Sequence, residues 1–209
     1  MFFDVWRFEL DCSETAVTDK SMMIFAKRAL PKMTKLRKFA FHANKTKLSD
    51  SSLQPLFHNL SVAKDQLITL RLSLSETQVE NQSLLALADT LSSLKNLQNL
   101  HLWLNQTKVE DSSVNSLWKS LKSFRRNLEC LSLGFDGTKV TDEGISDLGT
   151  EIAHEMKSLK EFRLWVSKTL VGDAGLRPLF ENLNMENIQV LQRRRPKFNG
   201  FSKGKPSKS

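Results

Sequence analysis

Apolar residues recur along this chain in one pattern that repeats about every 30 residues. Each unit reads φ-x-x-φ-x-φ-x-φ-x-x-T-x-φ, where φ is an apolar residue. The units open at Val5, Leu36, Leu67, Leu97, Leu128 and Leu159, with a partial seventh at Ile188. Successive starts lie 29 to 31 residues apart. So constant a period indicates a solenoid, in which each repeat is one unit of supersecondary structure.

The spacing inside a unit predicts a strand, a turn and a helix. Leu100, Leu102 and Leu104 alternate with the period of two that buries one face of a strand. Val114 and Leu121 belong to a later stripe with helical spacing. Between them a short acceptor side chain can cap a helix start, so we expect helices to begin at Asp19, Asp50, Asn81, Asp111, Asp142 and Asp173. The predicted fold is an α/β solenoid of about six repeats, with a parallel sheet on the concave face and helices on the convex face.

The stretch from Leu97 to Leu104, followed by Thr107 and Val109, resembles a leucine-rich repeat. The helical second half and the period resemble the ribonuclease-inhibitor-like class. The extra L-x-L step before the turn, with residues 140–145 after it, is similar to arrays abundant in ciliate proteins. The resemblance covers roughly residues 5 to 192 and implies a horseshoe-shaped arc that binds proteins. Threonine stands where the family often has a ladder-forming asparagine, so we expect the hydrogen bonding of the turn to differ.

The net charge of +8 is concentrated at the C-terminus. Residues 193–209 carry seven basic residues and no acidic one, which leaves a net charge of +1 on residues 1–192. We therefore divide the chain into a repeat domain, residues 1–192, and a disordered basic tail, residues 193–209. The tail begins with Arg193, Arg194, Arg195 and Lys197. This composition indicates that the tail either is attracted to nucleic acid or an acidic protein surface, or only keeps the chain soluble and binds nothing.

Two columns of strand residues are expected to point out of the concave face, and they contain large side chains. Aromatic and guanidinium groups dominate the energetics of protein interfaces. The partner-binding residues predicted on this basis are Trp103, Trp165, Arg163, Arg71, His101 and His42. The alternative is that the tryptophans lie against neighbouring side chains and cover the sheet.

No other pattern in the sequence predicts chemistry. No catalytic, cofactor-binding or metal-binding constellation is present, Cys12 and Cys130 are expected to be free thiols, and Trp118 falls on the buried helix stripe. No apolar run is long enough for a membrane helix, and the N-terminus lacks the pattern of a secretory signal, which predicts an intracellular, cytoplasmic protein. The apolar first repeat has no cap before it, so we expect another subunit or further sequence to cover that edge.

These observations favour a non-catalytic protein-protein interaction module, or a structural subunit of a larger assembly, that binds through its concave strand face. The alternative is an adaptor that uses its basic tail to associate with nucleic acid or an acidic surface. The two differ in their dependence on ionic strength.

Overall fold

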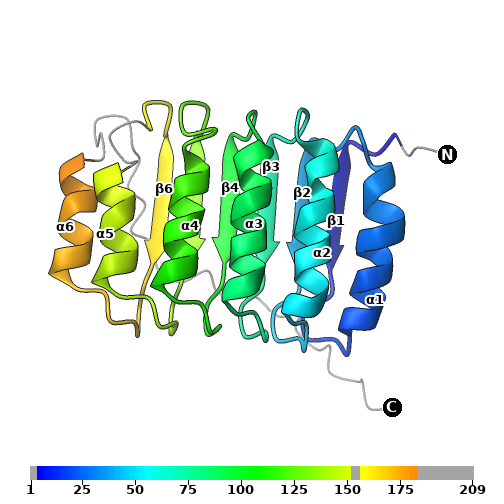
Figure 1. Cartoon of the computed structure of the whole chain (residues 1–209), viewed down its shortest axis with the longest axis horizontal. Helices are drawn as coiled ribbons and strands as arrows, with labels where there is room; N and C mark the ends of the chain where they lie inside the picture. The colour runs from blue at the N-terminus through cyan, green and yellow to red at the C-terminus, as the bar shows by residue number, and fades with distance from the viewer. Residues whose placement is uncertain (1–3, 152–155, 183–209) are drawn as a thin grey trace, which may run out of the picture.

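The computed structural model describes residues 4–151 and 156–182, and in this part of the chain six strands form one parallel sheet (Figure 1). The strands are β1 (Arg7–Asp11), β2 (Lys38–His42), β3 (Thr69–Ser73), β4 (Asn99–Trp103), β5 (Cys130–Gly134) and β6 (Glu161–Trp165). They pair in sequence order, and residues one repeat apart lie side by side, as Leu70 does with Leu100. The constant period produces this register, because each turn of the solenoid consumes the same length of chain. The prediction of an α/β solenoid is confirmed.

One layer of helices packs against one face of the sheet (Figure 1). The helices are α1 (Asp19–Ile24), α2 (Asp50–Leu60), α3 (Asn81–Ser93), α4 (Asp111–Leu121), α5 (Asp142–Glu151) and α6 (Asp173–Asn182). Each begins at the Asp or Asn column, as predicted. The first is less regular: α1 continues as a π-helical turn, Phe25–Ala29, and a 3-10 turn, Leu30–Lys32, where Pro31 has no N–H to continue an α-helix. A 3-10 turn, Ser61–Ala63, follows α2.

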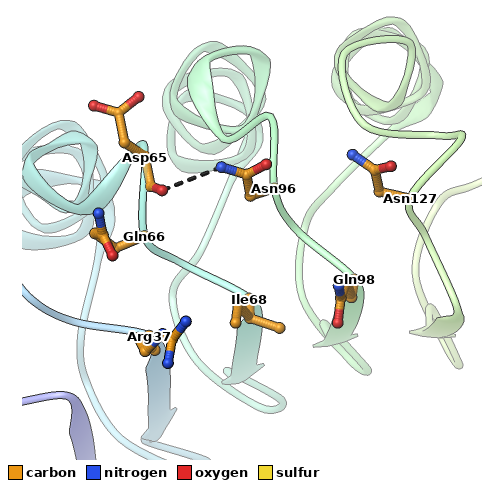
Figure 2. Close-up of a pocket in the computed structure, with 7 residues that line it drawn as sticks. All are labelled: Arg37, Asp65, Gln66, Ile68, Asn96, Gln98 and Asn127. Carbon is orange, nitrogen blue, oxygen red and sulfur yellow. Dashed lines mark hydrogen bonds between the residues drawn. The ribbon is translucent and has the colours of Figure 1, made fainter.

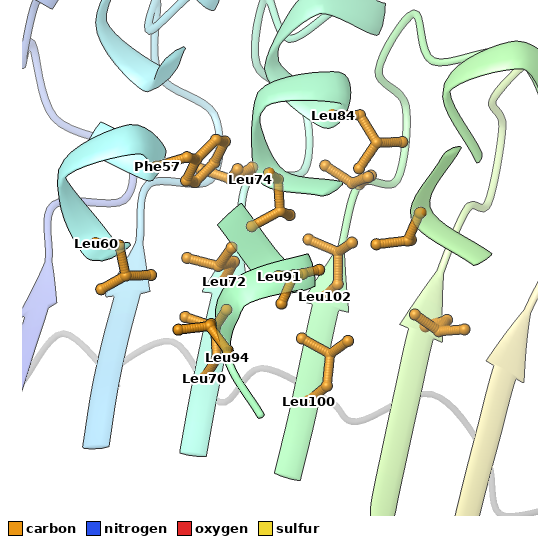
Figure 3. Packing of buried hydrophobic residues seen from close by; sticks show 14 of the residues in the cluster. Phe57, Leu60, Leu70, Leu72, Leu74, Leu84, Leu91, Leu94, Leu100 and Leu102 are labelled. Atoms are coloured by element: carbon orange, nitrogen blue, oxygen red, sulfur yellow. The ribbon is translucent and has the colours of Figure 1, made fainter. Parts of the chain in front are cut away.

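The core lies between the sheet and the helices and consists mainly of leucine (Figure 3). Leu70 and Leu72 of β3 are fully buried, as are Leu100 and Leu102 of β4 and Leu91 of α3. Burying one such side chain contributes about 2 kcal/mol. Because the leucines of adjacent repeats stack, each repeat buries its apolar face partly against its neighbours.

Trp118 lies on the buried side of α4, as predicted, and is 1% exposed. Its ring packs edge-on against Phe135, and its indole N–H donates to the carbonyl of Gly144 in the next repeat. Phe180 is the equivalent residue of α6, but it is 57% exposed. No described helix packs beyond α6, so the outer side of this last helix lacks the neighbour that covers Trp118.

The turn after each strand is closed by its threonine. In all six described repeats the threonine hydroxyl donates to the carbonyl oxygen three residues earlier, as Thr107 does to Leu104 at 2.6 Å. The residue before the threonine has a positive φ, such as 55° at Gln106. The turn bond therefore stays within one repeat, whereas Asn44 and Asn105 link neighbouring repeats by accepting from the backbone N–H groups of Ser75 and Asp136.

The Asp and Asn column does not cap its own helices, which corrects the sequence-based prediction. Each of these residues is the first of its helix, and the side chains of the first five reach the start of the next helix along the array. The Asp19 carboxylate accepts from the backbone N–H and hydroxyl of Ser49 and from the hydroxyls of Ser51 and Ser52, at 2.6–2.9 Å. Asp50, Asn81, Asp111 and Asp142 make equivalent bonds. The column thus fastens consecutive repeats together.

Candidate interaction surface

The sheet face opposite the helices, called here the open sheet face, carries the outward residues of all six strands. The parallel register aligns Arg71, His101, Ser132 and Arg163 in one row. The next row contains Ser73, Trp103, Gly134 and Trp165. Strands in a sheet are about 4.8 Å apart. Five of the six predicted binding residues therefore lie on four adjacent strands, β3 to β6.

Part of the Trp103 side chain packs against residues of the sheet. Its ring stacks against the His101 ring, with centroids 5.7 Å apart and an interplanar angle of 18°. It also lies over Gly134, because a Cβ built at that glycine would be 2.9 Å from Trp103 Cδ1. Trp103 and Trp165 are both half-buried. Trp103 therefore covers part of the sheet, as the second alternative drawn from the sequence describes, while part of its side chain stays exposed to solvent.

Arg71 and Arg163 differ in their burial and in their ion pairing. Arg71 on β3 is exposed and forms no ion pair within the described ranges. Arg163 is half-buried and pairs with Glu161 two residues earlier on the same strand. Between them, His101 is only 8% exposed. Burial, and then the charges of Arg71 and Arg163, lower the pKa of His101 to about 4, so its ring is neutral at neutral pH.

His42 lies apart from this group. It ends β2, is half-buried, and is aligned with Asp11 on one side and Ser73 on the other, so β3 separates it from Trp103. The predicted basic residues Arg193, Arg194, Arg195 and Lys197 fall outside the described residues.

Two small residues on β5 shape the surface, and the list of large side chains drawn from the sequence omitted them. Ser132 and Gly134 occupy the two outward columns where β4 has His101 and Trp103. They leave room above β5 for the Trp103 ring. The sequence contained a signal for this space, because each of these small residues stands between two large ones in its column.

Cys130 also points to the open face, but it is buried and unreactive. Its thiol lies 3.8 Å from His101 Nε2 and 3.9 Å from Ser132 Oγ. Burial, followed by the charge of Glu161, raises the pKa of this thiol to about 11, so the nucleophilic thiolate is scarce at neutral pH. Both cysteines are free, as predicted. Within residues 4–151 and 156–182, no three His, Cys, Asp or Glu side chains gather as metal ligands, and no helix is long and apolar enough to cross a membrane.

Comparison with known proteins adds structural neighbours but no sequence relative. No family model matches the sequence, and no curated protein is significantly similar to it. An internalin from Listeria monocytogenes aligns with 87% of this chain and 47% of its own length, at 17% identity and a TM-score of 0.48. The structure of the Rad7 and Elc1 complex in yeast aligns with 90% of this chain and 63% of its own, at 15% identity and a TM-score of 0.43. A second internalin of that bacterium, internalin C2, has 18% identity over 86% of this chain and 77% of its own, with a TM-score of 0.38. This chain spans less than two thirds of the length of the first two. The described part of this chain consists of strand, turn and helix units whose strands form one parallel sheet in sequence order.

Proposed function

We propose that this chain is a non-catalytic protein-protein interaction module, or a structural subunit of a larger assembly, that binds its partner through the open sheet face. The observation that carries the proposal is the row of Trp103, Gly134 and Trp165 beside the row that holds Arg71 and Arg163. These large side chains stand on paired strands and not on loops, so little conformational entropy is lost when they bind. The raised pKa of Cys130 and the lowered pKa of His101 both weigh against covalent or acid-base chemistry on this face.

The test compares two tryptophan substitutions with a matched aromatic control. A partner is first identified by affinity purification with the full chain, and its dissociation constant is then measured with purified proteins. Trp103→Ala and Trp165→Ala are each expected to weaken binding about 30-fold, the loss expected for an interface residue worth about 2 kcal/mol. Phe180→Ala removes an exposed aromatic on α6 and should leave affinity within about twofold. Unchanged affinity in both tryptophan variants, with folding intact by circular dichroism, contradicts the proposal.

The charge distribution favours a second candidate function, an adaptor that associates with nucleic acid or an acidic surface through its tail. Residues 193–209 hold seven of the basic residues and no acidic one. Tail-mediated binding should fall steeply between about 50 and 200 mM salt and disappear when the seven bases are changed to glutamine. Binding through the open sheet face should persist in that variant.

The finer classification is also a proposal. Helices of 10 to 13 residues in repeats two to six support the ribonuclease-inhibitor-like class. The proposed likeness to ciliate-type arrays rests on the extra L-x-L step before the turn and on residues 140–145 after it.

A further inference from the structure

The described charges are separated between the two long edges of the solenoid. We define the basic edge as the segments that lead from helices into strands, residues 30–38, 61–69, 94–99, 122–130 and 156–161. They contain eleven Lys or Arg and three Asp or Glu, a net charge of +8. The acidic edge comprises the segments from strands into helices, residues 11–19, 42–50, 73–81, 103–111, 134–142 and 165–173. It contains five Lys and eleven Asp or Glu, a net charge of −6. Because successive repeats stack in register, the segments of each kind lie along one edge of the solenoid (Figure 1), and their charged residues belong to that edge.

Ion pairs occur on both edges and leave part of the basic edge without a partner. Three of the five lysines on the acidic edge reach a glutamate one repeat earlier: Lys45 pairs with Glu14, Lys108 with Glu80, and Lys139 with Glu110. On the basic edge, Lys35 pairs with Asp4 and Lys160 with Glu129. Six of its basic side chains have no ion pair within the described ranges: Arg37, Lys38, Lys64, Lys95, Arg126 and Lys157. These six cations are exposed to solvent.

The helix dipole accounts for only part of this asymmetry. Cations are favoured within the last turn of a helix, where the backbone carbonyls are unpaired. Arg37 and Lys38 lie several residues beyond the last helical turn, Leu30–Lys32, and Lys38 is the first residue of β2. Their backbone N–H groups both donate to the Trp6 carbonyl, which fixes the backbone where these side chains begin. A requirement of the helices therefore does not explain these two charges.

A shallow hollow of about 290 Å³ lies on the basic edge beside Arg37 (Figure 2). Its lining residues are Arg37, Asp65, Gln66, Ile68, Asn96, Gln98 and Asn127. Asn96 and Asn127 donate to the carbonyls of Asp65 and Lys95, so their amide groups are held in place. The side-chain amides of Gln66 and Gln98 have no hydrogen-bond partner among the described residues. Figure 2 shows the Asp65 carboxylate turned away from Arg37 and Gln98.

We infer that the basic edge binds an acidic segment of a protein partner, with one of its carboxylates in the hollow beside Arg37 and Gln98. The Arg37 guanidinium offers the paired N–H donors that a carboxylate accepts, and the Gln98 amide, two strands away, offers a further donor. The free cations on either side extend the attraction along the repeats. A protein segment fits better than single-stranded nucleic acid, because Ile68 is the sole apolar residue lining the hollow and no aromatic ring there offers a base a stacking platform. This surface is separate from the open sheet face, so the inference does not depend on the proposed function.

The experiment measures binding of a fluorescein-labelled peptide of twelve alternating glutamate and serine residues, with a twenty-nucleotide oligothymidine as the comparison. The 209-residue chain is used, with the seven basic residues of 193–209 changed to glutamine so that these residues do not contribute. The double variant Arg37→Glu, Lys38→Glu is expected to weaken peptide binding at least tenfold. The matched control Lys20→Glu, Lys47→Glu changes the net charge equally on two exposed lysines outside the basic edge, and should weaken it less than threefold.

Three results overturn the inference. Equal losses in the two double variants show that only net charge matters. No loss in the Arg37, Lys38 variant shows that the hollow is not used. Tighter binding of oligothymidine than of peptide, lost in the same variant, assigns the edge to nucleic acid. One result supports the inference. The peptide affinity of the tail variant falls as salt rises, and this salt dependence is reduced by the Arg37 and Lys38 substitutions but not by the control substitutions.

Discussion

Replacing Asp19 with alanine removes the acceptor that joins the first repeat to the second. The wild-type carboxylate receives one backbone and three hydroxyl hydrogen bonds from Ser49, Ser51 and Ser52. A hydrogen bond to a charged group contributes about 1.5–3 kcal/mol in isolation, but these four share one half-buried carboxylate and water replaces some of them. We therefore expect the variant to lose about 2–4 kcal/mol of unfolding free energy at pH 7. Because the removed bonds join repeats one and two, the loss of stability should appear as early opening of the N-terminal end in the variant.

The dependence on pH gives this prediction a second readout. Partial burial acts to raise the pKa of the Asp19 carboxyl, but the hydrogen bonds from Ser49, Ser52 and Ser51 outweigh it and hold the pKa below its ordinary value. A carboxyl with a lowered pKa stabilises the fold above its unfolded pKa, about 4, and loses that contribution as the pH falls through the folded value. The gap between wild type and Asp19→Ala should thus narrow in acid.

The assay is urea unfolding followed by circular dichroism at pH 7 and at pH 3, with hydrogen exchange to locate the opening. Asp89→Ala removes an exposed carboxylate of α3 that has no hydrogen-bond or ion-pair partner among the described residues, and should cost less than about 0.5 kcal/mol. Asp19→Asn keeps one acceptor oxygen and should lie between wild type and Asp19→Ala. If Asp19→Ala is no more destabilising than Asp89→Ala, the column does not fasten the repeats and the reasoning fails.

Three further substitutions test the packing and the open sheet face. Trp118→Phe leaves the Gly144 carbonyl without its donor and a void in the core, so thermal unfolding should show a loss of about 2–4 kcal/mol; a loss below about 1 kcal/mol contradicts that contact. Gly149→Ala places a Cβ 2.3 Å from the backbone nitrogen of Leu179, and should cost about 2–3 kcal/mol by forcing α5 from α6, whereas unchanged urea stability disproves the close approach. His101 has a pKa near 4 when folded against 6.5 when free, so the unfolded chain takes up its proton first. The unfolding free energy should keep the full contribution of the neutral His101 ring above about pH 6.5, and should fall by about 1–3 kcal/mol towards pH 4. His101→Gln should reduce this dependence on pH; an unchanged dependence would show that the pKa of His101 is not lowered.

The candidate site was only partly readable from the sequence. The period placed Trp103, Trp165 and the arginines in outward columns, because residues one repeat apart must face each other in a parallel sheet. It did not reveal that Trp103 rests on Gly134 and His101, since side-chain direction depends on the size of the neighbour across the strand gap. It also placed His101 among the outward residues without predicting its burial.

The sequence by itself determined the repeat, the strand, turn and helix order, and the stacking of leucines in one core. These features depend on local periodicity, and every repeat carries the same pattern. An irregularity such as Pro31 therefore changes one helix and leaves the array intact. Only the tertiary structure decided which groups meet between repeats. The Asp and Asn column binds the next helix instead of its own, and the charges of separate loops gather along opposite edges, because both follow from how one repeat is placed on another. That placement brings together residues about 30 positions apart, which no local pattern encodes.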